Sequence, residues 1–185
     1  MRVFIAVLFL IFSLQSLSKA DDISDFQIEE MSVGDSLLDH YTLFEIKKNL
    51  LIYKNTDKKF TATNLVSTSE NFDSIQVHFK TNDNKFKIYT IDGIFAYNKK
   101  LSDCNKKKSE INKSISFLFK NLERNDGNNL QMVSGRGTMD RTIYLFDNND
   151  FIEIVCYKYN VSTHTNMGRL GVVKKELDDW IISLK

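Results

Sequence analysis

The stretch IQVHFKTNDNKFKIYTI, residues 75–91, decides the fold class. Ile75, Val77 and Phe79 alternate with polar residues, which is the period-two pattern of a strand with one buried face and one face in water. The Asn- and Asp-rich residues 81–84 then give a turn signal before a second apolar run. The stretch therefore predicts an antiparallel hairpin, with His78 on the water-facing side of its first strand.

Further strands are expected on both sides of this hairpin. Gly93 interrupts the second run, which is typical of a bulge. Residues 147–150, Asp-Asn-Asn-Asp, read as the turn of another hairpin; they lack the residue pattern of a calcium loop. The remaining runs with strand character are 51–53, 60–65, 94–97, 142–146, 151–157 and 170–173.

Three segments show the apolar spacing of amphipathic helices. The first runs from Asp35 to Lys48, with Asp35 or Ser36 as its N-cap. The second follows residues 102–103 and ends before the Asn-Asp-Gly signal at 125–127. The third is 175–184, with Trp180 expected in the core. The basic residues Lys106, Lys107, Lys108 and Lys113 are interpreted as a solvated helix face.

Short turns between most strands predict the α+β class. We expect a mainly antiparallel sheet of about five or six strands, with three helices packed on one face. No repeat, linker or break in composition divides residues 21–185, so they are expected to form a single domain.

The N-terminus has the features of a signal peptide. Arg2 is followed by an apolar run over 3–12, and Ser18-Lys19-Ala20 predicts cleavage between Ala20 and Asp21. A membrane anchor would need roughly 20 apolar residues. We therefore expect a periplasmic or secreted protein with no membrane span once residues 1–20 are removed.

The charge balance argues against nucleic acid as a partner. The chain carries 25 basic and 24 acidic residues, and removal of the signal peptide leaves 23 against 24. Phosphate binding requires a net basic face. The abundance of Lys, Asn, Ile and Phe, with no Pro, matches A/T-rich codons and reflects the base composition of a genome rather than a function.

Cys104 and Cys156 are the two cysteines of the chain. An even count in an exported protein favours a disulfide, which here would close a loop of about 50 residues and contribute on the order of 4 kcal/mol. No Cys-x-x-Cys spacing supports a redox pair. Two thiols and three scattered histidines do not predict a zinc site, and no metal or cofactor is expected.

Gly34-Asp35-Ser36-Leu37 matches the signature of GDSL-type esterases, in which the serine is the nucleophile. Such chemistry also needs a histidine base and oxyanion donors. The last histidine, His164, lacks the aspartate three residues before it that the family carries. Ser36 is therefore only a weak catalytic candidate, and a helix N-cap is the alternative interpretation.

No other pattern in the sequence predicts a catalytic or binding site. His40, His78 and His164 are far apart in the sequence and are interpreted as surface histidines. The loop Ser134-Gly135-Arg136-Gly137 could contact an anion, but it does not follow a clear strand or open a helix.

Two segments carry a resemblance. Residues 28–39, IEEMSVGDSLLD, and 73–80, DSIQVHFK, resemble a group of uncharacterised exported proteins of A/T-rich bacteria. In that group a glycine usually precedes the methionine, where this chain has Glu30. The resemblance implies an exported α+β domain and brings no activity or site residue with it.

Three functions follow as hypotheses. The first is a non-enzymatic exported domain that binds a protein or small ligand at the envelope. The second is a GDSL-like serine hydrolase that uses Ser36. The third is a secreted enzyme inhibitor that acts through an exposed loop, with residues 125–141 or 160–169 as the candidates.

Overall fold

A computed structural model describes residues 22–51, 58–97, 100–132, 134–161 and 164–184. The expected signal peptide and its cleavage site at Ala20 and Asp21 lie outside the described residues. In chain order the elements are η1 (Ile23–Asp25), β1 (Gln27–Ile28), β2 (Met31–Ser32), η2 (Leu37–Asp39), α2 (Leu43–Lys48), β3 (Leu50–Leu51), β4 (Phe60–Val66), β5 (Ser74–Lys80), β6 (Thr90–Ala96), α3 (Leu101–Leu118), β7 (Glu123–Gln131), β8 (Gly137–Leu145), β9 (Phe151–Tyr159), β10 (Met167–Val173) and α4 (Lys175–Ser183).

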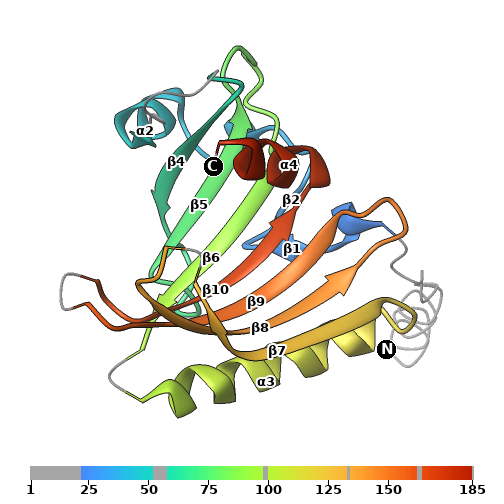
Figure 1. Cartoon of the computed structure of the whole chain (residues 1–185). Coiled ribbons are helices and arrows are strands. Elements are labelled where there is room, and N and C mark those ends of the chain that lie inside the picture. Colours follow the sequence, from blue (N-terminus) through green and yellow to red (C-terminus); the bar gives the residue numbers. More distant parts are fainter. Residues whose placement is uncertain (1–21, 52–57, 98–99, 133, 162–163, 185) are drawn as a thin grey trace, which may run out of the picture.

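One curved antiparallel sheet dominates the structure (Figure 1). Its eight strands have the order β3-β4-β5-β6-β10-β9-β8-β7, and β1 and β2 form a separate two-stranded sheet. The α+β class and the antiparallel pairing are confirmed, whereas the expected five or six strands are too few. The hairpin predicted around residues 147–150 is present as β8–β9. Strands β5 and β6 also pair antiparallel, but β6 begins at Thr90 instead of directly after the predicted turn at 81–84.

Strand β7 accounts for part of the difference in strand number. Its sequence, ERNDGNNLQ, was expected to contain a helix stop and a loop. Instead it pairs with β8 along its length, with a register shift between Gly127 and Leu130. The ladder with β8 satisfies backbone groups that a turn would leave to water, so tertiary pairing overrides local turn preference.

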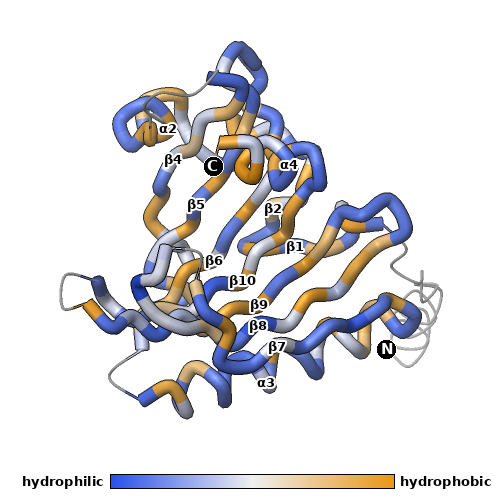
Figure 2. The backbone as a smooth tube through the Cα atoms, in the orientation of Figure 1, coloured by the Kyte–Doolittle hydropathy of each residue, from blue (hydrophilic) through white to orange (hydrophobic). Residues whose placement is uncertain are grey.

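The first face of the sheet holds the main core. Side chains of β5, β6, β10 and β9 that point to this face pack against the N-terminal segment and α3, and Figure 2 shows apolar and polar residues alternating along these strands. Ile75, Val77, Ile91, Ile152 and Ile154 are all fully buried there. Gly93 lies in this layer with continuous register on both sides, so the expected bulge is absent. The Phe72 ring occupies the space where a Cβ at Gly93 would be.

The opposite face is partly covered by α4, which corrects the expectation of helices on one face. Leu177 and Trp180 of this helix pack against Phe60 of β4. Trp180 is 4% exposed, so its predicted core position is confirmed. In Figure 1, α3 and α4 lie on opposite sides of the sheet.

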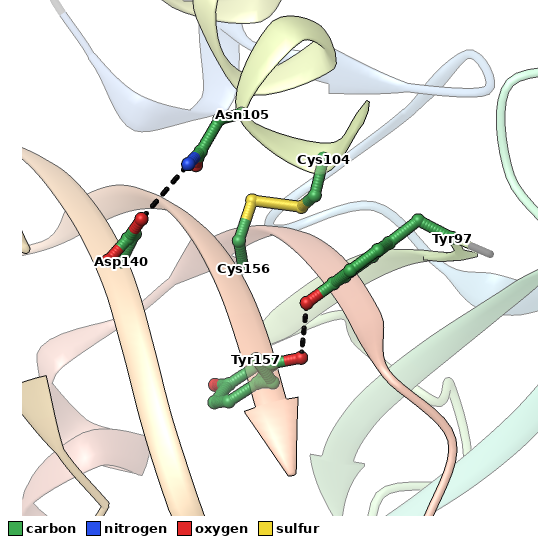
Figure 3. The surroundings of a disulfide bond; sticks show 6 residues. All are labelled: Tyr97, Cys104, Asn105, Asp140, Cys156 and Tyr157. Atoms are coloured by element: carbon green, nitrogen blue, oxygen red, sulfur yellow. Dashed lines mark hydrogen bonds between the residues drawn. A yellow bond between two sulfur atoms is a disulfide. The ribbon is translucent and has the colours of Figure 1, made fainter. Parts of the chain in front are cut away.

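A disulfide joins α3 to β9 (Figure 3). Cys104 and Cys156 are bonded, as predicted, and both are almost completely buried. Tyr97 donates a hydrogen bond from its hydroxyl to the carbonyl of Tyr157 beside them, at 2.7 Å. The disulfide thus fixes α3 to β9, the third strand from the β7 edge of the sheet.

The segment expected to be one helix over 35–48 is divided. Ser36 caps the short η2, and Thr42 starts α2 with a reciprocal capping box to Glu45. None of the helices in the described ranges has the length and apolar character needed to cross a bilayer.

Candidate functional site

A pocket of about 390 Å³ lies between α4 and the sheet face that α4 covers. We call it the α4 pocket. One side is apolar and includes Phe151, Val173, Leu177 and Ile181. The sheet supplies its polar groups: His78, Thr90, Asp92, Arg141, Glu153 and Arg169. A partly open volume of this size, with an apolar wall and a few convergent polar groups, is typical of small-molecule sites.

The strand register brings the charged side chains together. Asp92 of β6 lies opposite Gly171 of β10, which in turn lies opposite Glu153 of β9. In the neighbouring row, Arg169 and Arg141 both lie opposite Val155. Alternate residues share a face, so carboxylates and guanidinium groups occupy adjacent rows above the same surface.

The two arginines converge on Glu153. Arg141 donates from Nε to Glu153 Oε2 at 2.8 Å, and Arg169 pairs through Nη2 with Oε1. Glu153 is 4% exposed, and a buried carboxylate requires such pairing. The pairing leaves both of its oxygens satisfied by the protein.

Asp92 is less well satisfied. It is 1% exposed, and its nearest cation is Arg169, with Nη1 3.5 Å from Oδ1. Within the described part of the chain, neither oxygen of Asp92 has a hydrogen-bond partner, and the same holds for Thr90 Oγ1 and Arg169 Nε. A buried carboxylate left in this state is costly, because its desolvation is not offset by hydrogen bonds.

Gly171 makes room for the Asp92 carboxylate. A Cβ built at Gly171 would lie 2.5 Å from Asp92 Oδ1. Any larger residue at this position would displace the carboxylate from the floor of the pocket. The backbone of β10 therefore shapes the site as directly as the charged side chains do.

Burial shifts the protonation equilibria in the pocket. It raises the pKa of the Asp92 carboxyl, against the opposing effect of the Arg169 charge. Burial, with a smaller contribution from Arg169, lowers the pKa of His78 to about 4. Burial also raises the pKa of Tyr157. Several perturbed groups in one cavity are a recognised mark of a functional site.

The structure contradicts the expected surface position of His78, which is 4% exposed. Gln76, His78 and Lys80 do lie on the side of β5 opposite the main core, as the alternation predicted. However, α4 covers part of that side, so the polar side of the strand is also buried. The amphipathic pattern of 175–184 was the available signal, because Leu177 and Trp180 need a second apolar surface.

Ser36 lies outside the α4 pocket. Its hydroxyl donates to the carbonyl of Lys85 at 2.8 Å and accepts from the backbone N–H of Leu38 at 3.3 Å. Both partners are main-chain groups, which favours the N-cap interpretation of Gly34-Asp35-Ser36-Leu37 over that of a nucleophile. Hydrolysis through Ser36 stays a prediction from the sequence.

The structure keeps the three histidines apart. His40 follows η2 and is exposed, whereas the His164 ring lies tilted against the Tyr159 ring, with centroids 4.9 Å apart. His78 alone of the three lines the α4 pocket. Across the described ranges, no cluster of three or more His, Cys, Asp or Glu side chains is arranged to hold a metal ion.

The loops proposed for an inhibitor are partly strands. Most of residues 125–141 belong to β7 and β8, whereas part of 160–169 does connect β9 to β10. An exposed inhibitory loop over 125–141 is therefore wrong as a structural expectation. Enzyme inhibition itself stays a prediction.

No family model matches the chain, and neither curated proteins nor solved structures gave a match.

Proposed function

We propose that this chain is an exported, non-enzymatic domain that binds a small molecule in the α4 pocket, with Asp92 as the anchor. The observation that carries the proposal is the buried Asp92 carboxylate beside the Thr90 hydroxyl, both without a hydrogen-bond partner among the described residues. A ligand that donates hydrogen bonds to them would remove the cost of leaving them unsatisfied.

The pocket also suggests what the ligand looks like. The Arg141 and Arg169 guanidinium groups pair with Glu153. The unsatisfied groups then include both Asp92 oxygens as acceptors, the Thr90 hydroxyl, and the Nε of Arg169 as a donor. The opposite wall is mainly apolar, although α4 also contributes Asp178 to the lining. The fitting ligand has a hydroxyl or amine head that reaches Asp92 and an apolar body that lies against Leu177 and Ile181.

Export is supported by two features. The Cys104–Cys156 disulfide suits an oxidising compartment, and residues 1–20 have the pattern of a secretory leader. The resemblance to exported proteins of A/T-rich bacteria agrees with this. We place the domain in the periplasm or outside the cell, in a binding or envelope-accessory role.

A series of six-carbon probes tests the proposal. Hexylamine, 1-hexanol and hexanoate share one apolar body and differ in the head group. Isothermal titration of the disulfide-bonded protein should show the amine binding most tightly, the alcohol more weakly and hexanoate least. The carboxylate of hexanoate would face the carboxylate of Asp92, and the nearby Arg169 guanidinium is already paired with Glu153.

The Asp92→Asn variant keeps the shape and removes the charge. A hydrogen bond to a charged group contributes about 1.5–3 kcal/mol, so hexylamine affinity should fall by about tenfold to about 150-fold. Asp39→Asn, on an exposed carboxylate, is the matched control and should bind as the wild type does. Equal binding of all three probes, or an unchanged amine affinity in Asp92→Asn, would contradict the proposal.

A further inference from the structure

A second hollow lies on the other side of the sheet, between α3 and the edge strand β7. Its volume is about 710 Å³. We call it the α3–β7 groove. Its α3 wall includes Asn105, Lys108, Ser109, Asn112, Lys113 and Phe117. Its sheet wall is formed by Arg124, Asp126 and Asn128 of β7 with Thr142 of β8.

The groove follows from how α3 sits on the sheet. The helix is bonded to β9 through Cys104 and makes its main sheet contacts there. Strand β7 lies two strands further out, at the sheet edge. The strip between the helix and the edge strand is therefore lined by polar side chains instead of being filled by core residues.

Lys108 is the unusual residue of this groove. It is 8% exposed, which contradicts the expected solvated position, yet its ammonium forms no hydrogen bond or ion pair within the described residues. Burial lowers the pKa of Lys108, although the charges of Asp140 and Asp126 oppose that shift. The Lys108 Nζ is not among the buried atoms that lack a hydrogen-bond partner, so the apolar stem is buried while the ammonium reaches the water of the groove.

The nearby carboxylates are already engaged. Asp126 accepts from the Thr142 hydroxyl at 2.5 Å and pairs with Arg124 at 3.0 Å. Asp140 accepts from the Asn105 side chain at 3.0 Å and from the backbone N–H of Asn129 at 2.7 Å. Neither is in direct contact with Lys108, so the ammonium is left to face the groove.

Charge in the groove is biased, although the chain as a whole is almost neutral. The lining carries three cations and one carboxylate: Lys108, Lys113, Arg124 and Asp126. Lys108 and Lys113 stand at separate points along α3. Spaced cations suit a ligand with carboxylates distributed along its length better than a single compact anion.

The groove has the length and polarity for an extended peptide. The α3 residues from Asn105 to Phe117 span about 18 Å along the helix axis, equal to about five residues of extended chain. The Asn and Ser side chains offer both donors and acceptors, which match main-chain amides. Phe117, 72% exposed at one end, offers an apolar contact.

We infer that the α3–β7 groove binds an extended acidic peptide segment of a partner protein, with Lys108 pairing one of its carboxylates. This site is separate from the α4 pocket, and neither proposal depends on the other. Lys108 then acts as a binding residue, held without a partner in the free protein and neutralised on association.

Fluorescence anisotropy with a labelled peptide tests this inference. The probe is a seven-residue peptide with Glu at alternate positions, and the same peptide with Gln is its uncharged match. The full, disulfide-bonded protein should bind the Glu peptide at least about tenfold more tightly than the Gln peptide. Lys108→Met should abolish that preference, and Lys108→Arg should retain most of it.

Lys106→Met is the matched control, because it removes the same charge from an exposed position on the same helix. If Lys106→Met and Lys108→Met lost the preference for the Glu peptide equally, the effect would come from overall charge and the inference would be overturned. So would displacement of the peptide by inorganic phosphate at equal concentration, since the groove would then recognise a compact anion. Thermal unfolding of Lys108→Met should be unchanged or shifted upward, which separates lost binding from lost folding.

Discussion

His78 should make the folded protein sensitive to acid. Its pKa is about 4 in the folded chain, where burial disfavours the charged ring, and about 6.5 when unfolded. As the pH falls through about 6.5, the unfolded chain takes up a proton that the folded chain does not, so stability is lost. From about pH 7.5 to about pH 4.5 this difference amounts to about 2.5 kcal/mol in the free energy of unfolding.

The comparison with His78→Gln isolates this contribution. Asp92 has a raised pKa and titrates in the opposite sense, because the folded chain holds its proton to higher pH. Both proteins contain Asp92, so its effect largely cancels when their pH profiles are subtracted. Urea unfolding at several pH values should show wild-type stability falling by about 2.5 kcal/mol more than that of His78→Gln. Parallel profiles would refute the buried, neutral state of His78, and His40→Gln is the control for an exposed imidazole.

Three further changes have defined outcomes. Replacing Cys104 and Cys156 with alanine opens a loop with a sequence separation of 52, and urea unfolding should show a loss of about 4 kcal/mol; a loss below about 1 kcal/mol would contradict this role. Gly171→Ala places a methyl group against Asp92, so it should lower the free energy of unfolding by about 1–3 kcal/mol, and by less in an Asp92→Ala background. Additive losses would show that the two residues are not in contact. Gly93→Ala should lower the thermal stability of the fold, because the added methyl group would contact the Phe72 ring. Thermal unfolding should show a smaller loss when Gly93→Ala is made in a Phe72→Ala background, and an equal loss would mean that the strain does not come from this ring.

The sequence predicts those parts of the fold in which local pattern and burial agree. The alternation over 75–79 predicts β5 and its core face, and the even number of cysteines predicts the disulfide. Strand β7 could not be recognised, because Asn-Asp-Gly-Asn-Asn has the local preferences of a turn and becomes a strand only through its pairing with β8.

The α4 pocket was hidden for a related reason. Asp92, Glu153 and Arg169 are single polar residues on three strands, and each would be predicted to face solvent. Only the strand order, with β10 inserted between β6 and β9, makes them neighbours. Sequence spacing contains no information about that order, although the apolar stripe of α4 indicated that a second face of the sheet is covered.

The carboxyl ¹³C signal of Asp92, followed by NMR with and without hexylamine, tests the proposed function most directly. If the α4 pocket binds donor ligands through this carboxylate, saturation with the amine should move the signal. Its raised pKa should also fall, because a bound cation favours the charged form. An Asp92 signal and pKa that remain the same at saturating hexylamine would contradict the role of Asp92 as the anchor of the site.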